Sequence, residues 1–169
     1  MDKKQNTAIA FLRVAEKILG IKNNIKIEFN NNIYFQNNDL SAMFIKEGYN
    51  IVFNNLFIEK ASLIEIMITG FHEARHAYQY MQIEFGNKHQ FKYPELQSTL
   101  IEWKKDFDNY MQPGQISKEE YLNRPTEIDA IAFSYYLADE LLNVKQVIPD
   151  EIKEKVNVRI KEIKKTIII

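Results

Sequence analysis

The sequence predicts an α+β fold in which a small, mostly antiparallel β-sheet follows an N-terminal helix and precedes a series of helices. Apolar residues at a spacing of three and four predict helices at 3–19 and 62–85. Between them, residues 25–58 alternate apolar and polar positions and contain turn-forming clusters, which indicates strands. The chain has 169 residues, of which 46% are apolar and 27% charged, so it is long enough to bury a core. We therefore expect a single domain over residues 1–169.

The first half of the chain supplies one helix and the sheet. The helix at 3–19 is expected to end at Gly20, which suits a left-handed cap. A hairpin turn is expected at Gly48. If the strand expected at 50–54 lies at the edge of the sheet, its free backbone N–H and C=O groups can pair with an extended peptide. The alternative is that a loop covers that edge. Strands are expected at 25–29, 33–35, 42–45 and 50–54.

The second half is expected to be mostly helical. Capping boxes begin the helix at 62 and a short helix at 117–122, and Pro125 suits the first turn of another. In the last segment Val156, Val158 and Ile160 alternate, so a strand is an alternative to a helix there. Helices are expected at 62–85, 94–111, 117–122, 125–143 and 149–169.

The helix at 62–85 contains the motif H-E-x-x-H, as His72-Glu73-Ala74-Arg75-His76. The two histidines are one helical turn apart and project to the same side, where one Zn²⁺ can take both imidazoles. In this motif the glutamate, here Glu73, does not bind the metal but takes a proton from the water that the metal activates. The chain has only 3 histidines, which makes a chance match improbable, although an ordinary amphipathic helix with two histidines is the competing interpretation.

A zinc site needs a third ligand, and the absence of cysteine leaves histidine or carboxylate. The candidates are His89, Glu127, Asp129 and carboxylates elsewhere in the chain. His89 lies beyond the expected end of the motif helix, which favours a surface loop. Glu127 begins a second buried helix, and the small Ala130 one turn later permits close approach to the first, so Glu127 is preferred. Asp129 lies roughly on the opposite side of that helix. The competing interpretation of both carboxylates is that their negative charge complements the positive N-terminal end of the helix dipole.

The motif, followed by E-x-x-A-x-x-F at Glu127, Ala130 and Phe133, resembles the gluzincin side of the zincin metallopeptidases. The most similar pattern is that of ImmA/IrrE-type peptidases and other small zincins of phages and mobile elements. This resemblance implies a zincin-like fold with one Zn²⁺ per chain, held by His72, His76 and Glu127, with Glu73 as the catalytic residue.

One position departs from the pattern. Such peptidases often carry Asp or Asn four residues after the ligand glutamate, where it supports a metal-binding histidine, and this chain has Ile131. The support must then come from elsewhere, and Asp129, Asp139 or a backbone carbonyl are candidates.

The expected function is therefore a zinc-dependent metallopeptidase, an endopeptidase rather than an exopeptidase, that hydrolyses a peptide bond in a specific protein partner. Tyr121 and Arg124 are candidate donors to the tetrahedral intermediate, and Arg75 is expected to face away from the metal. The alternative is a zincin-like binding or regulatory module with weak or no catalysis, which the departure at Ile131 favours.

Composition narrows the possible partners. A net charge of −1 gives no electrostatic reason to expect nucleic acid. Charges within the first apolar run and the absence of a cleavage-site pattern argue against a signal peptide or membrane insertion, so a cytoplasmic protein is expected. The identity of the substrate and the oligomeric state are not readable from the chain.

Overall fold

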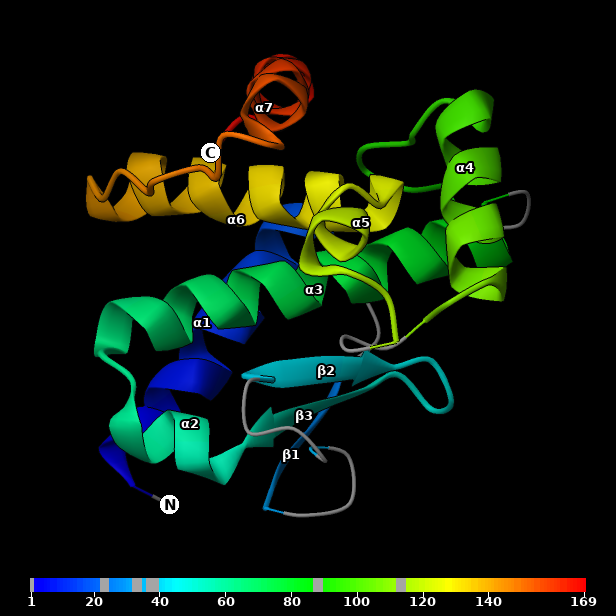
Figure 1. Cartoon of the computed structure of the whole chain (residues 1–169). Helices are drawn as coiled ribbons and strands as arrows, with labels where there is room; N and C mark the ends of the chain where they lie inside the picture. The colour runs from blue at the N-terminus through cyan, green and yellow to red at the C-terminus, as the bar shows by residue number, and fades with distance from the viewer. Residues whose placement is uncertain (1, 22–24, 32–34, 36–39, 87–89, 112–114) are drawn as a thin grey trace.

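The structure, a computed structural model, describes residues 2–21, 25–31, 35, 40–86, 90–111 and 115–169 (Figure 1). Its α+β composition confirms the expected fold class. The elements in chain order are α1 (Lys3–Leu19), β1 (Lys26–Asn30), β2 (Ala42–Ile45), β3 (Asn50–Asn54), α2 (Asn55–Lys60), α3 (Leu63–Phe85), α4 (Gln97–Asp108), α5 (Lys118–Leu122), α6 (Pro125–Leu142) and α7 (Lys153–Thr166).

Helix α3 is the central element of the fold. The sheet lies on one side of it, α6 lies along another side, and α1 crosses behind it (Figure 1). Helix α1 approaches α3 at Gly70, where an added Cβ would lie 3.5 Å from the carbonyl oxygen of Ala8. A side chain larger than alanine at this position would separate the two helices. The capping box that begins α3 and the end of α1 at Gly20, with a φ of 70°, were expected from the sequence. Helix α1 also begins with a capping box, at Asp2, which was not anticipated.

The sheet is mixed, in the order β1-β3-β2, rather than mostly antiparallel. Strand β1 pairs with β3 in parallel, and β2 pairs with β3 in antiparallel fashion. The hairpin between β2 and β3 turns at Gly48 and Tyr49, which have φ values of 76° and 52°. The strand expected at 33–35 falls on residues of which only Phe35 is described, and Phe35 is not in a strand.

The suggestion that 50–54 forms an edge strand is wrong, because β3 is the central strand. Its residues Ile51, Val52 and Phe53 are all fully buried, since both faces of this strand are covered. A continuous apolar run is typical of such a strand, whereas alternation indicates a half-exposed one. Within the described part of the chain, the edges of the sheet are β1 and β2.

Helix α2 was not anticipated. It follows β3 without a connecting loop, because the side chain of Asn54 accepts a hydrogen bond from the backbone N–H of Leu56 and caps the helix. A capping asparagine directly after a buried strand was the signal for it.

Helices α6 and α7 complete the core above α3 (Figure 1). Residues 153–166 are helical, so the strand alternative for this segment is wrong: Val156 and Ile163 are buried one heptad apart, and Val158 is exposed. Helices α4 and α7 are shorter than expected at both ends. In the described residues, no helix has both the length and the apolar character that crossing a membrane requires.

Candidate metal centre

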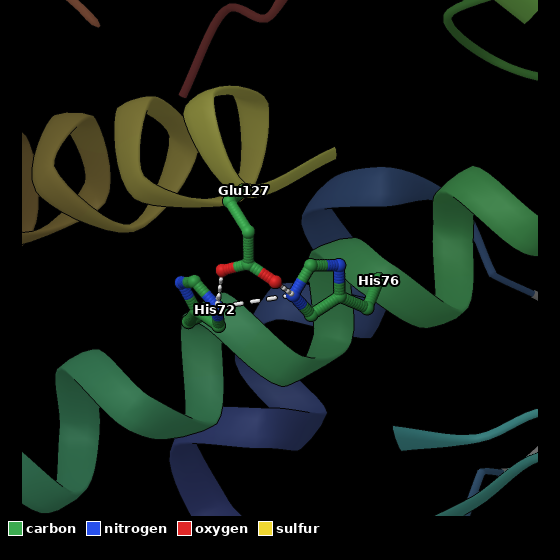
Figure 2. A group of neighbouring side chains, drawn as sticks. All are labelled: His72, His76 and Glu127. Atoms are coloured by element: carbon green, nitrogen blue, oxygen red, sulfur yellow. Dashed lines mark hydrogen bonds and ion pairs between the residues drawn. The ribbon is translucent and has the colours of Figure 1, made fainter. Parts of the chain in front are cut away.

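Helices α3 and α6 bring His72, His76 and Glu127 together (Figure 2). The histidines lie one turn apart on α3, and Glu127 projects toward them from the first turn of α6. The Nε2 atoms of His72 and His76 are 3.0 Å apart. The carboxylate of Glu127 bridges them, with Oε2 at 3.3 Å from His72 Nε2 and Oε1 at 3.4 Å from His76 Nε2.

These distances fit a tetrahedral metal ion. Zinc bonds to imidazole nitrogen and carboxylate oxygen of 2.0–2.2 Å imply ligand atoms about 3.3 Å apart. The two Nε2 atoms lie near that value from each other, and each lies near it from a different oxygen of Glu127. One ligand atom from each of the three residues lies within 4.8 Å of the others, and imidazole nitrogen and carboxylate oxygen are ligands that Zn²⁺ favours. Three protein ligands leave one tetrahedral position open. The cluster, which consists of the three residues selected from the sequence, can therefore hold a metal ion.

The electrostatics of the cluster keep its carboxylate ionised. Burial alone would raise the pKa of Glu127, but His76 and His72 outweigh burial and hold that pKa well below its usual range. Burial alone would lower the pKa of His76. The negative charge of Glu127 outweighs burial and raises the pKa of His76 to about 9. Without a metal, Glu127 and His76 thus form an ion pair.

Glu73 lies beside this cluster in a different environment. It is buried, with 6% of its surface exposed, and burial raises the pKa of its carboxyl group. A hydrogen bond from the backbone N–H of Phe44 acts in the opposite direction. Its second oxygen, Oε2, has no hydrogen-bond partner among the described residues. Glu73 is therefore a proton acceptor with one oxygen unused by the fold.

A cleft of about 470 Å³ opens over these groups. Its floor contains Glu73, His76 and Glu127. One wall is strand β2 with the turn that follows it, and the other wall comes from the end of α4 and from α5. The wall residues are Leu40, Ala42, Met43, Phe44, Ile45, Lys46 and Glu47 on the first side, and Asp106, Phe107, Asp108, Tyr110, Tyr121 and Thr126 on the second.

Strand β2 lies along this cleft, and among the described residues no strand pairs with its outer edge. The backbone N–H of Asn54 donates to the carbonyl of Ser41, so Ser41 forms a hydrogen-bonded pair with Asn54. In an antiparallel ladder every second residue forms such a pair, and the residues between direct their backbone groups to the other side. Ala42 and Phe44 consequently direct their N–H and C=O groups away from β3. The hydrogen bond from Phe44 N–H to Glu73 agrees with this register.

Asp129 is not placed as a metal ligand. Its carboxylate accepts hydrogen bonds from Arg75 at 2.7 and 3.0 Å and from Arg159 at 2.7 Å. Burial raises the pKa of Asp129, but these two guanidinium groups hold it well below its usual range. Arg75 faces Asp129 and Glu95, as expected for a residue that does not contact the metal. The remaining candidate ligand, His89, lies outside the described residues.

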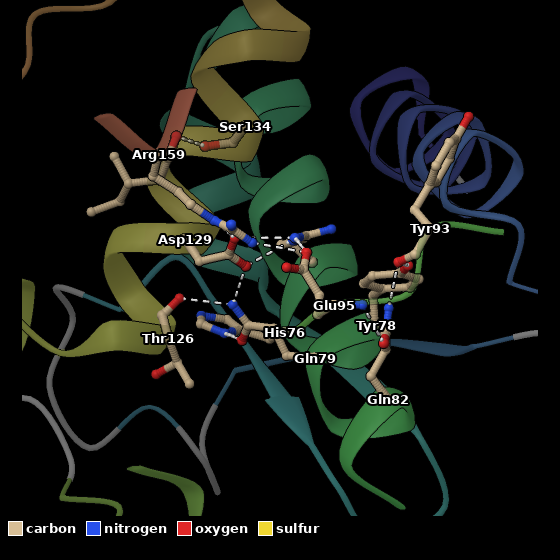
Figure 3. A network of polar contacts seen from close by, with 12 residues as sticks. His76, Tyr78, Gln79, Gln82, Tyr93, Glu95, Thr126, Asp129, Ser134 and Arg159 are labelled. Carbon is tan, nitrogen blue, oxygen red and sulfur yellow. Dashed lines mark hydrogen bonds and ion pairs between the residues drawn. The ribbon is translucent and has the colours of Figure 1, made fainter. Parts of the chain in front are cut away.

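Gln79 is a site residue that the sequence analysis missed. Its Oε1 lies 2.9 Å from Nδ1 of His76, and its Nε2 donates to Asp129 (Figure 3). Asp129 thus supports a histidine as suggested, but through an intervening glutamine. Asp139, the other candidate support, is at the surface and lies 3.9 Å from Lys164. The missed signal was the spacing: Gln79 follows His76 by three positions and shares its side of α3.

The two candidate donors to the intermediate differ in their placement. Tyr121 lines the cleft, and its hydroxyl hydrogen-bonds Glu127. Burial and that carboxylate both raise the pKa of Tyr121, so its proton is retained. Arg124 instead pairs with Asp106 at 2.6 Å and donates to the carbonyls of Asp106 and Met111. Arg124 is engaged in holding α4 to α6 and is not among the residues that line the cleft, which favours Tyr121 over Arg124 as the donor.

Tyr110 is a second residue that the sequence analysis did not select as part of the site. It lines the cleft and hydrogen-bonds Tyr121. Tyr110 falls within the helix expected at 94–111, whereas α4 ends at Asp108 and leaves Tyr110 in the segment beyond it.

Comparisons with known protein families, with curated proteins and with solved structures find no match for this chain.

Proposed function

We propose that this chain is a zinc-dependent metallopeptidase of the zincin type, with one Zn²⁺ held by His72, His76 and Glu127. The observation that carries the proposal is Glu73 Oε2, a buried carboxyl oxygen that has no partner among the described residues and lies beside a cluster that can bind metal. Leaving a buried polar group unpaired costs about 1–3 kcal/mol of stability. A buried group of this kind, with a shifted pKa at the floor of a cleft, is typical of a catalytic residue.

The roles follow from the chemistry of each group. Zinc bound at the cluster would polarise the scissile carbonyl and activate a water molecule for attack. Glu73 then accepts the proton of that water at Oε2 and transfers it to the nitrogen of the leaving amine. Burial raises the pKa of Glu73, which makes its carboxylate a stronger base toward the water than an exposed carboxylate.

The position of Tyr121 supports it as the donor to the developing oxyanion. Its hydroxyl keeps its proton and lies next to a proposed zinc ligand at the edge of the cleft. This proton, which Tyr121 donates to Glu127 in the structure, would turn to the carbonyl oxygen and stabilise the negative charge that forms there.

The proposed substrate is an extended stretch of polypeptide. Ala42 and the carbonyl of Phe44 offer backbone groups for an added strand, and the wall formed by β2 is largely apolar. An edge strand running along the cleft suits an internal stretch of chain better than a chain end, which favours endopeptidase activity on a protein partner.

The alternative, a binding module without catalysis, was favoured by Ile131 in place of a residue that supports a ligand histidine. The contact of Gln79 with His76 supplies such a support, so this departure no longer argues for the alternative.

The test is cleavage of a library of peptides of random sequence by the zinc-loaded protein, with products identified by mass spectrometry. We expect internal cleavage by the wild type and none by Glu73→Gln, which should retain zinc because Glu73 is not a ligand. The control is Glu59→Gln, an exposed carboxyl on α2 outside the cleft lining. Equal cleavage by wild type and Glu73→Gln would refute the assignment, and a zinc-loaded wild type that cleaves nothing would favour the binding module.

A further inference from the structure

The side chain of Gln79 is held in one orientation by its neighbours on α6. It is fully buried. Its Nε2 lies 2.9 Å from the carbonyl oxygen of Thr126 and 2.6 Å from Oδ2 of Asp129. Both of these groups accept hydrogen bonds, so the amide nitrogen must face them. The amide oxygen then faces Nδ1 of His76, at 2.9 Å (Figure 3).

This orientation determines which nitrogen of His76 carries the proton. An amide oxygen only accepts hydrogen bonds, so Nδ1 of His76 must be the donor. When the ring is neutral, Nε2 is then unprotonated and has a free lone pair. Nε2 is the atom that lies within the cluster, 3.0 Å from His72 Nε2 and 3.4 Å from Glu127.

Asp129, on which Gln79 depends, is itself fixed by two arginines. Arg75 reaches it from α3 and Arg159 from α7, and both also contact Glu95 at 2.7 and 2.8 Å. The hydrogen-bonded chain from His76 through Gln79 to Asp129 is therefore anchored by three helices. Gln79 has little freedom to rotate and present its nitrogen to the imidazole.

We infer that Gln79 is a positioning residue for the metal centre, which fixes His76 as the Nδ1–H tautomer and so directs Nε2 toward the metal. This role rests on the proposed metal centre, and it replaces the support that is missing at Ile131. Groups that orient a ligand histidine in this way typically change metal affinity about 10–100-fold when they are removed. The competing role for Gln79 is structural only, as a bond between α3 and α6.

The chain offers a matched control in Gln82, one turn further along α3. Gln82 is also buried, with 1% of its surface exposed. Its amide donates to the carbonyl of Tyr93 at 2.8 Å and accepts from the backbone N–H of Glu95 at 3.1 Å, and neither bond involves His72 or His76. Methionine has nearly the shape of glutamine without its hydrogen bonds, so Gln79→Met and Gln82→Met remove comparable structural bonds from one helix.

Zinc affinity is measured on the full chain by competition with a chromophoric chelator. We expect Gln79→Met to weaken Zn²⁺ binding about 10–100-fold and Gln82→Met to leave it at the wild-type value. Equal affinities in the two variants, whether weakened or unchanged, would overturn the inference and leave Gln79 as a structural bond.

A second measurement does not depend on zinc binding. Long-range ¹H–¹⁵N spectra of the metal-free protein, at a pH where the imidazoles are neutral, report the tautomer of each histidine, and the chain has only 3. We expect His76 to be the Nδ1–H tautomer in wild type and a mixture of tautomers in Gln79→Met. A wild-type His76 protonated at Nε2 would contradict the inference. A wild type that takes up no zinc would refute the proposed function, while this spectrum would still decide the role of Gln79.

Discussion

Replacement of Asp129 by alanine tests the buried network behind the metal centre. The carboxylate is 2% exposed and accepts four hydrogen bonds, two from Arg75, one from Arg159 and one from Gln79. Without it, two guanidinium groups share the single carboxylate of Glu95. Arg75 cannot recover by hydration, because its side chain is completely buried.

The expected loss is large for a single substitution. Breaking a buried ion pair by removing one partner typically costs about 3–5 kcal/mol. In a protein of this length each kcal/mol shifts Tm by about 2–4 °C, so Asp129→Ala should lower Tm by about 6–20 °C. Removing Asp129 also frees Gln79 to rotate, so we expect zinc affinity to fall together with stability.

The assay is urea unfolding of the metal-free protein, with Asp139→Ala as the control on the same helix. Asp139 is 39% exposed and lies 3.9 Å from Lys164, which keeps Glu140 as a second partner at 3.0 Å. Its removal should change the free energy of unfolding by about 0–1 kcal/mol. If the two variants unfold at the same urea concentration, the network does not stabilise the fold in the way argued above.

Two further predictions concern pH and catalysis. In the metal-free protein the pKa of His76 is raised from 6.5 to about 9, so the stabilisation that its charge provides is complete below pH 6.5 and is lost as the pH rises through 9. Urea unfolding with a chelator present should show this decrease in stability in wild type and not in His76→Gln. A wild type whose stability is constant from pH 6.5 to 9.5 would contradict the ion pair between His76 and Glu127. Tyr121→Phe should lower kcat by about 10²–10³-fold with KM unchanged, because a donor to the oxyanion acts on the transition state. Peptide cleavage at saturating zinc measures this, and an unchanged kcat would assign the oxyanion to another donor.

The parts of the site that were predicted correctly depend on spacing within a helix. His72 and His76 share one side of α3 because four residues make about one turn, and this holds whatever surrounds the helix. Glu127 was selected because Ala130 permits close packing, and α6 does lie directly against α3. Gln79 follows the same rule of spacing and was missed only because an amide three residues after a histidine is common on helices.

The parts that were missed depend on contacts between distant segments. Nothing local distinguishes a parallel partner from an antiparallel one for β1, because the order β1-β3-β2 is set by which strand lies between the other two. The continuous apolar run of Ile51, Val52 and Phe53 was the signal in the sequence for a central strand, and all three are buried in the structure. Arg124 was assigned to the site from its position before α6, whereas its partner Asp106 lies on α4 and became visible only in three dimensions.

The most direct test of the metal centre is the zinc content of wild type and Glu127→Ala after purification without added metal and after dialysis against Zn²⁺. Glu127 contributes the only carboxylate of the cluster found in the described residues, and its removal leaves two histidine ligands, fewer than the three that catalytic zinc sites use. We predict about one zinc per wild-type chain and loss of most of it in Glu127→Ala. Equal zinc in both proteins would move the third ligand away from Glu127, and a wild type without zinc under either condition would contradict the metal centre itself.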